Sequence, residues 1–119
     1  MPLALRLLLL AALAPLSAAA QGTLVKDINP PFGAGSSPSY PQRFKALREK
    51  VIFAAIRQDV AQEIWASDGT EAGTILLKDI NPSGDSQPHE LTLFRDRILF
   101  PARDADHWQL WSTNGTEHA

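Results

Sequence analysis

The amino-acid sequence predicts an all-β protein made of tandem four-stranded antiparallel meanders, about two β-propeller-like blades in all. Two observations predict it. Short runs rich in residues that favour strands are separated by Gly, Pro, Asn and Asp, which is typical of short strands joined by turns. The runs also recur along the chain, two of them 46 or 47 residues apart. Four short strands in about 45 residues is the size of one propeller blade.

Composition sets the outer limits of this prediction. The chain has 119 residues, no Cys and a formal net charge of -2, with 45% hydrophobic and 20% charged residues. These values are ordinary for one small folded domain. The absence of Cys excludes a disulfide framework and a thiolate site. The mildly negative charge disfavours a nucleic-acid partner, which usually requires a basic face.

Residues 1–20 differ from the rest of the chain. They contain one charge, Arg6, followed by an apolar run and then by Pro15 and small residues up to Ala20. This pattern predicts a signal peptide that is cleaved after Ala20, and so a secreted or cell-surface location with no membrane span in the remaining chain. The apolar run is shorter than the roughly 20 residues that cross a bilayer. An uncleaved anchor or a buried helix is the alternative.

The first repeated segment of the remaining chain is residues 23–30, TLVKDINP, which matches residues 75–82, ILLKDINP. We expect an orphan strand here, ended by Pro30 because proline offers no N–H to a neighbouring strand. A Pro-, Gly- and Ser-rich loop follows at Pro31–Pro41, and its counterpart at Ser83–Pro88 is shorter. Such loops either carry ligand contacts or vary freely at the surface.

The next repeated segment is a hairpin pattern. Residues 44–55 and 91–102 each consist of an apolar run, a charged tripeptide and a second apolar run. The first copy alone is also compatible with a helix, but Ile98 and Pro101 of the second copy favour strands. Pro101 further predicts an edge strand or a β-bulge, since it cannot donate to a neighbouring strand.

The third repeated segment is strand, turn and strand. Residues 63–71 recur at 109–117, with Asp68-Gly69 replaced by Asn114-Gly115. Both dipeptides favour a type I′ hairpin turn, in which both central residues have positive φ. The exchange of Asp for Asn indicates a turn rather than a catalytic carboxylate. Trp65 and Trp111 recur at equal positions, so we expect both to pack in the core between blades.

Together these segments give a repeat region over residues 21–119, with units at roughly 42–82 and 89–119 and the orphan strand at 23–30. Eight strands make two blades, whereas closed propellers need about four or more. Two explanations stay open. The chain is a fragment of a longer repeat protein, or copies assemble as a homo-oligomer through unpaired strands, the orphan strand completing the last blade.

Residues 63–74 and 77–82 resemble the bacterial ELWxxDGT repeat, also called the hyalin-like repeat. The resemblance implies secreted or cell-surface proteins with many tandem units and a propeller-like fold, and it implies no known enzyme activity. The second unit departs from the motif, because Asn114 replaces the aspartate and His118-Ala119 stand where Ala-Gly-Thr is expected.

No motif names a reaction, so we predict no catalytic, metal-binding or cofactor-binding residue and no cofactor. His89, His107 and His118 lack the spacing of metal ligands. Asp104-Ala105-Asp106 is the nearest approach to a calcium loop and is weak. A nucleophile elbow, a P-loop and a dinucleotide fingerprint are all missing from the sequence.

The candidate ligand contacts are Trp108 and His107, because Trp108 has no repeated counterpart and can offer a stacking platform to a sugar or a partner. Local packing of Trp108 is the alternative. We therefore expect a non-catalytic binding, adhesion or scaffold module with an unknown surface ligand or protein partner. A truncated portion of a propeller-based hydrolase or lyase, with carboxylates at the mouths of the blades, is the second hypothesis, and loss of turnover on replacing Asp104 and Asp106 would favour it.

Overall fold

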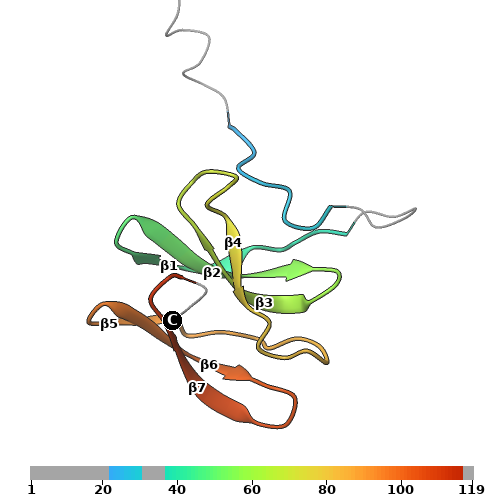
Figure 1. Cartoon of the computed structure of the whole chain (residues 1–119), viewed down its shortest axis with the longest axis vertical. Coiled ribbons are helices and arrows are strands. Elements are labelled where there is room, and N and C mark those ends of the chain that lie inside the picture. Colours follow the sequence, from blue (N-terminus) through green and yellow to red (C-terminus); the bar gives the residue numbers. More distant parts are fainter. Residues whose placement is uncertain (1–21, 31–36, 117–119) are drawn as a thin grey trace, which may run out of the picture.

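The computed structural model describes residues 22–30 and 37–116, and all regular structure within them is β-strand (Figure 1). The strands are β1 (Gln42–Leu47), β2 (Lys50–Arg57), β3 (Ala61–Ser67), β4 (Ile75–Lys78), β5 (Thr92–Phe94), β6 (Arg97–Arg103) and β7 (Trp108–Thr113). Strands β1 to β4 form one antiparallel sheet in chain order, and β5 to β7 form a second. The all-β prediction is confirmed, with four strands in the first repeat and three in the second.

Tight hairpins join β1 to β2 and β5 to β6. The last paired residues are Leu47 with Lys50 and Phe94 with Arg97, so two residues form each turn. The hairpin prediction for residues 44–55 and 91–102 is therefore confirmed, and the helical alternative is wrong. The first turn residue is left-handed in both copies, with φ of 55° at Arg48 and 55° at Arg95.

The prediction that Pro101 marks an edge strand is wrong, because β6 is the central strand of the second sheet. The carbonyl of Pro101 accepts the N–H of His89 at 3.4 Å, on the side of β6 that β5 occupies. Pairing between β5 and β6 ends at Leu99. Because the nitrogen of Pro101 points to that same side, beyond the end of β5, its missing N–H costs no strand pairing.

The type I′ prediction for Asp68-Gly69 is also wrong. Strand β3 ends at Ser67 and β4 begins at Ile75, so residues 68–74 form a longer loop. Only Gly69 has a positive φ, at 91°, and its counterpart Gly115 has 89°. Side chains of the loop accept its backbone N–H groups, so a two-residue turn is not needed to satisfy them.

The expected orphan strand is absent from the structure. Residues 22–27 adopt no regular structure, so the described chain holds seven strands where we expected eight. The physical reason is that no neighbouring strand pairs with this segment, and Leu24 is 79% exposed. Ile28 and Asn29, at its end, are nevertheless buried.

The apolar core has two parts, one on each face of the first sheet. Side chains of β2 and β3 alternate between the faces, as expected for strands. Ile52 and Ile64 point toward the second sheet, where they pack with Phe100. Phe53 and Trp65 point the other way and pack with Ile28. Figure 1 shows this order of layers, with residues 22–30 on one side of the first sheet and the second sheet on the other.

The two tryptophans of the repeat both contribute to the core, but only Trp111 packs between the two sheets as predicted, and the prediction is wrong for Trp65. Trp111 packs between the two sheets. Trp65 is 1% exposed and lies beneath Ile28 on the opposite face of the first sheet. Full burial of a large side chain contributes on the order of 1.5–3 kcal/mol, so the Trp65 indole is a major part of its layer, while Trp111 is only partly buried.

The internal repeat is visible in the backbone. Positive φ values at non-glycine residues recur 47 positions apart, in the pairs Tyr40 and Gln87, Arg43 and Glu90, Arg48 and Arg95. Hydrogen bonds recur in the same way. The N–H of Ile56 donates to the carbonyl of Ser39 at 2.7 Å, and that of Arg103 donates to Ser86 at 2.8 Å. The duplication in the sequence is therefore a duplication of structure.

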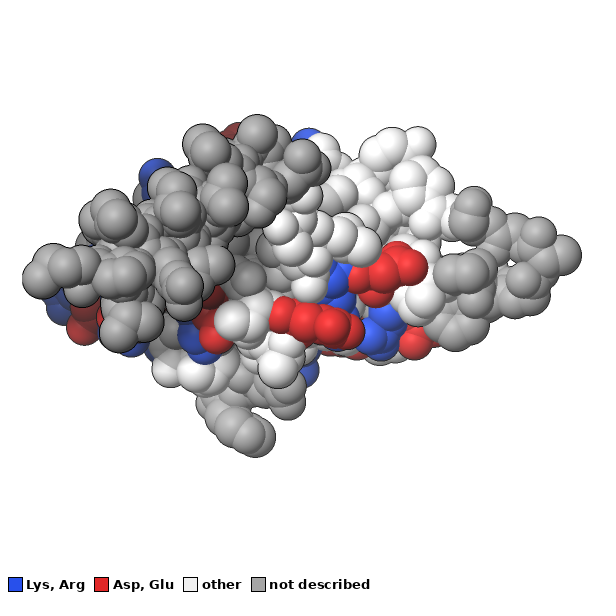
Figure 2. Space-filling model, turned by 90° about the horizontal axis from the view of Figure 1, so that it is seen from above, with Lys and Arg blue, Asp and Glu red and all other residues white. Residues whose placement is uncertain are grey.

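On the face shown in Figure 2, acidic and basic side chains of the described residues lie side by side. This mixture fits the small net charge of the chain. None of the described residues belongs to a helix long and apolar enough to cross a membrane. The predicted signal peptide, residues 1–20, lies outside the described residues.

We predict that Arg95→Gly stabilises the protein by about 0.5–1 kcal/mol. Left-handed backbone costs a residue with a side chain roughly 1–2 kcal/mol, and the added freedom of glycine in the unfolded chain offsets about half of that. Thermal unfolding should show a melting temperature several degrees higher. The control is Asp96→Gly in the same turn, where φ is not positive, and it should lower the melting temperature instead. Equal effects of the two variants would contradict the explanation.

Candidate functional site

The aspartate of the DGT motif organises the loop between β3 and β4. Asp68 Oδ1 accepts the N–H of Thr70 at 2.9 Å and its hydroxyl at 2.6 Å. The hydroxyl bond of Thr70, followed by its N–H, holds the pKa of Asp68 below its usual range. Asn114 Oδ1 accepts the same two donors from Thr116, at 3.0 and 2.7 Å. Because an amide oxygen serves equally well, Asp68 is a structural residue and needs no charge for this role.

The rest of the motif completes the same loop. The N–H of Gly73 donates to the Thr70 hydroxyl at 3.0 Å, and Asp68 packs so closely on Gly73 that a Cβ there would collide with its carboxylate. The hydroxyls of Ser67 and Thr74 bond to each other at 2.8 Å across the base of the loop. The motif therefore encodes a loop held by its own side chains.

The glutamate of the motif is the one carboxylate with a strongly raised pKa among the described residues. Glu63 is fully buried, and its two oxygens accept the N–H groups of Ile80 and Asn81 at 3.0 and 3.1 Å. Burial raises the pKa of Glu63 to about 7, and the neighbouring Asp79 carboxylate raises it further, against the lowering effect of Ser86 and the two N–H donors.

Glu63 therefore ties the segment after β4 to the middle of the first sheet. The Asp79 side chain has a buried oxygen with no hydrogen-bond partner among the described residues. A protonated Glu63 carries the O–H donor that this oxygen lacks. Both oxygens of Glu63 are engaged and no part of it reaches solvent, so its chemistry is structural.

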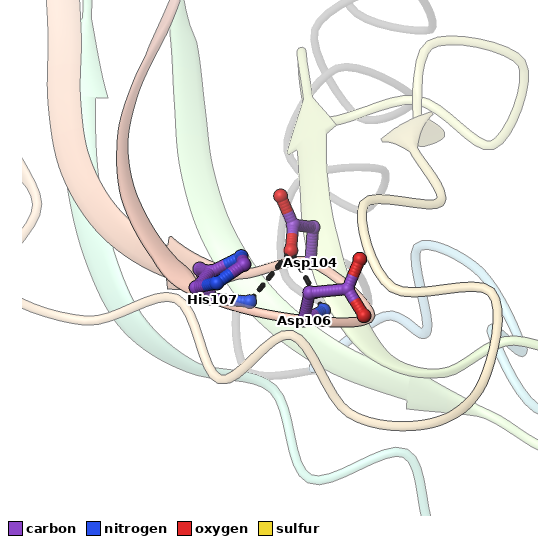
Figure 3. Close-up of side chains that lie close together, drawn as sticks. All are labelled: Asp104, Asp106 and His107. Carbon is purple, nitrogen blue, oxygen red and sulfur yellow. Dashed lines mark hydrogen bonds between the residues drawn. The ribbon is translucent and has the colours of Figure 1, made fainter.

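The Asp104-Ala105-Asp106 segment forms a turn between β6 and β7 (Figure 3). Ligand atoms of Asp104, Asp106 and His107 lie within 4.8 Å of one another. Asp104 Oδ1 accepts the N–H of Asp106 at 2.9 Å and that of His107 at 2.8 Å, and these bonds, that of His107 first, hold the pKa of Asp104 below its usual range. The geometry is that of an aspartate closing a turn, and exposed acidic groups of this kind occur widely without a metal.

Trp108 stands apart from that cluster and lines a hollow of about 400 Å³ at one end of both sheets. Its side chain is 51% exposed. The ring of His89 meets the indole edge to face, with centroids 5.5 Å apart and planes at 85°. The other lining residues are polar: Gln42, Arg43, Gln62 and Gln87. An exposed aromatic surface is thus surrounded by amide, guanidinium and imidazole groups.

Both sheets and the segment between them build this hollow. Gln42 begins β1 and Trp108 begins β7, while Gln87 and His89 lie on the connection from β4 to β5. That connection is fixed at Ser86, whose N–H donates to the carbonyl of Gln62 at 2.9 Å. Ser86 also accepts the N–H of Arg103 from the second sheet at 2.8 Å. The hollow is consequently held by backbone hydrogen bonds to both sheets.

The structure separates the two candidate contacts that the sequence analysis joined. Trp108 lines the hollow, whereas His107 belongs to the Asp104 turn and does not. The histidine beside the indole is His89, which sequence reasoning did not select. One signal could have found it. Gln42 and His89 lie 47 positions apart, and Gln62 and Trp108 lie 46 apart, so the hollow joins equivalent positions of the two repeats.

The two loops expected to carry contacts have different outcomes. Most of Pro31–Pro41 lies outside the described residues, at 31–36. In Ser83–Pro88 the side chains of Ser86 and Pro88 are fully buried, Ser86 bonds to both sheets, and Gln87 lines the hollow. Only that part of the second loop is available for a ligand contact at the hollow.

Comparison of this chain with models of protein families, with curated proteins and with solved structures found no match.

We predict that Glu63 makes folding stability depend on pH. Its folded-state pKa of about 7 lies above the ordinary value of 4.5, so between these values the folded chain holds a proton that the unfolded chain has lost. The free energy of unfolding should therefore fall as pH rises through this window, by about 3 kcal/mol at most. Urea unfolding at pH 5 and pH 8 measures the change.

Glu63→Gln should abolish that part of the pH dependence, since an amide does not titrate in this range. Glu49→Gln is the control, because Glu49 is an exposed carboxylate in the turn between β1 and β2. The difference between the two variants isolates the contribution of Glu63. If both variants keep the full pH dependence of the original protein, Glu63 does not have a raised pKa.

Proposed function

We propose that this chain is a non-catalytic binding module whose ligand contacts Trp108. One observation carries the proposal: the indole is half-exposed inside a hollow whose other walls are polar side chains. A half-exposed Trp with a water-accessible face provides a large rigid contact area at little cost in conformational entropy. The polar walls then fix the orientation of what it contacts.

The ligand class that suits this arrangement is a carbohydrate. A pyranose ring has an apolar C–H face, which can stack on the Trp108 indole, and a rim of hydroxyl groups. Gln42, Gln62 and Gln87 each offer an amide that both donates and accepts hydrogen bonds, as hydroxyl groups require. Arg43 adds further donors. A hydrophobic peptide segment would leave these polar groups unpaired, at a cost of about 1–3 kcal/mol for each buried group.

We also propose that the two sheets are consecutive propeller-like blades of an exported repeat protein of the ELWxxDGT type. The supporting observations are the strand arrangement of four plus three, the recurring hydrogen bonds and the leader-like residues 1–20. The motif residues support it too, since Glu63, Asp68 and Gly73 each hold backbone in place. A motif with a purely architectural role suits a protein whose function lies in its variable surface residues.

The alternative is part of a propeller-based hydrolase or lyase. Its best support is the raised pKa of Glu63, because active sites often contain such groups. Burial and the two N–H donors assign that group to the architecture instead. The exposed pair Asp104 and Asp106 is the remaining carboxylate candidate, and Asp104 accepts two backbone N–H groups. Binding at Trp108 is therefore the better-supported function.

We predict that Trp108→Ala lowers the affinity for a glycan selected on a glycan array by tenfold or more, which corresponds to about 1.4 kcal/mol. The reason is loss of the stacking surface. Isothermal titration calorimetry of the selected glycan measures the change. His107→Ala is the matched control, because His107 is the exposed neighbour outside the hollow, and it should leave the affinity unchanged.

Three outcomes would contradict this proposal. The first is a glycan array with no selected ligand. The second is equal loss of affinity in the Trp108→Ala and His107→Ala variants. The third is turnover in a hydrolase or lyase panel that is lost in Asp104→Asn with Asp106→Asn, which would support the enzyme hypothesis.

A further inference from the structure

The two sheets pack through unlike faces. The first sheet contributes a face that we call the isoleucine face, made of Leu47, Ile52, Ile64 and Ala66. The second sheet contributes a face that we call the tryptophan face, made of Ile98, Phe100, Ala102 and Trp111. All eight residues belong to one continuous core, and among these eight only Trp111 is partly buried.

Each sheet has a counterpart of both faces, because the sheets are repeats. The tryptophan face of the first sheet consists of Val51, Phe53, Ala55 and Trp65. The isoleucine face of the second sheet consists of Phe94, Leu99, Leu110 and Ser112. The contact between the sheets is therefore head to tail. At one end of the molecule, the tryptophan face of the first sheet is packed with Ile28 of the N-terminal segment and with no second sheet. At the other end, the isoleucine face of the second sheet has no sheet packed on it among the described residues.

The unused isoleucine face is apolar and exposed. Leu110 is 72% exposed, whereas its counterpart Ile64 is 2% exposed. Phe94 is 54% exposed, whereas its counterpart Leu47 is 3% exposed. Phe94, Leu99 and Leu110 line a hollow of about 350 Å³. In the second sheet the positions of the isoleucine face are also apolar, but no described residue packs on them.

The edge of the second sheet is unused too. In the first sheet β4 pairs with β3, joining Trp65 to Leu76 and Ala66 to Ile75. The corresponding edge, that of β7, has no paired strand in the described part of the chain. Residues 23–26 carry the sequence pattern of β4 and have no strand partner either. Leu24 is 79% and Val25 is 41% exposed, while Leu77, the counterpart of Val25, is 6% exposed.

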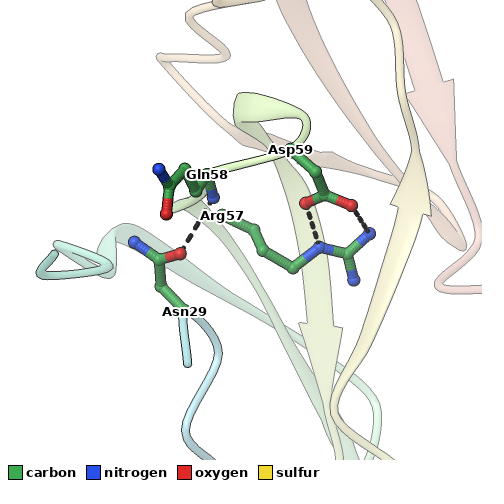
Figure 4. Close-up of polar contacts among 4 residues, drawn as sticks. All are labelled: Asn29, Arg57, Gln58 and Asp59. Carbon is green, nitrogen blue, oxygen red and sulfur yellow. Dashed lines mark hydrogen bonds and ion pairs between the residues drawn. The ribbon is translucent and has the colours of Figure 1, made fainter. Parts of the chain in front are cut away.

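Residues 22–30 already occupy the place that the repeat assigns to them. Ile28 packs on Phe53 and Trp65, as its counterpart Ile80 packs with Phe100 and Trp111. The Asn29 side chain accepts the N–H of Gln58 at 2.9 Å, beside the Arg57–Asp59 ion pair (Figure 4). The segment is therefore anchored to the turn between β2 and β3, and only its strand partner is missing.

A hollow beside this segment marks the position of the missing sheet. It has a volume of about 370 Å³ and apolar walls that include Leu24, Val25, Phe44 and Phe53. One end of the molecule thus has an apolar hollow next to an unpaired strand-like segment. The other end has exposed apolar side chains next to an unpaired strand edge.

We propose that a second copy of this chain joins these two ends, so that the second sheet of one copy packs on residues 22–30 and the tryptophan face of the next. The contact between the two sheets within each chain is the template for the contact between copies. Residues 23–26 of one copy then pair antiparallel with β7 of the other. The register of β3 with β4 assigns Trp111 to Leu24 and Ser112 to Thr23.

Such an interface is heterologous, since the two copies contribute different surfaces. It closes into a ring if the rotation permits and otherwise extends as a filament. Each copy supplies two sheets, and closed propellers have roughly 4–8 blades, so rings of about two to four copies are expected. Pairing of free strand edges and burial of large apolar side chains both favour the assembly.

Sedimentation velocity of the purified protein tests the assembly. We expect a species of at least two copies, and we expect Leu110→Arg to raise its dissociation constant at least tenfold. Leu110 is exposed in the single chain, so the substitution should leave thermal unfolding of the monomer unchanged. Ala105→Arg is the matched control, because it adds the same charge at an exposed turn away from the interface. It should assemble like the original protein.

Disulfide trapping tests the register. The chain has no Cys, so an introduced pair reacts without background. Thr23→Cys with Ser112→Cys places two paired residues opposite each other, within reach of a disulfide. We expect covalent dimers and larger species on mild oxidation. Leu24→Cys with Ser112→Cys is the control, because a shift of one residue points the thiols to opposite faces, and it should cross-link at least several-fold less.

Three results would overturn the proposal. One is a protein that sediments as a monomer at roughly 100 μM. Another is equal dissociation of the Leu110→Arg and Ala105→Arg variants. The last is a disulfide formed within a single chain, which would assign residues 23–26 to its own β7. None of these results bears on glycan binding at Trp108, which lies in a hollow within one chain.

Discussion

The structure depends on the packing of two unlike sheet faces. Strands β2 and β3 are buried on both sides, so their side chains alternate between two apolar layers. Ile52 and Ile64 reach the second sheet, and Phe53 and Trp65 reach the N-terminal segment. A slip of one residue in the pairing would exchange every side chain between the layers. The order of the layers is therefore set by this alternation, and the positions of the turns, the hollow and the free edge follow from it.

The polar residues of the motif serve that packing. Glu63 is buried between strands, where an unpaired backbone N–H would be costly, and it accepts two of them from the segment after β4. That segment must leave the first sheet and enter the second, and Ser86 bonds to both on the way. In the loop between β3 and β4, Asp68 likewise accepts a backbone N–H, and in the second repeat Asn114 does the same. Surface residues such as Trp108 do not hold the backbone in place in this way, so they are available to contact a ligand.

The sequence predicted the strands well and the connections unevenly. Strand positions follow from alternation and from the second copy of each run, as with residues 44–55, where the copy at 91–102 excluded a helix. The DGT loop was misjudged because Asp-Gly also favours short hairpins, and the hydroxyls that hold the longer loop come from residues up to seven positions apart. Strand pairing was misjudged for residues 23–26, since a strand needs a partner as well as a suitable sequence.

By itself the sequence determined the all-β class, the repeat and its four-plus-three strands, because periodicity and duplication are properties of the chain alone. Only the tertiary structure decided that His89 meets the Trp108 indole while the N–H of His107 bonds to Asp104, since these contacts depend on how the connection from β4 to β5 lies against β7 in the folded chain. It also decided which apolar faces are covered. Leu110 and Ile64 occupy equivalent positions in the repeat, yet only Ile64 has a sheet packed on it.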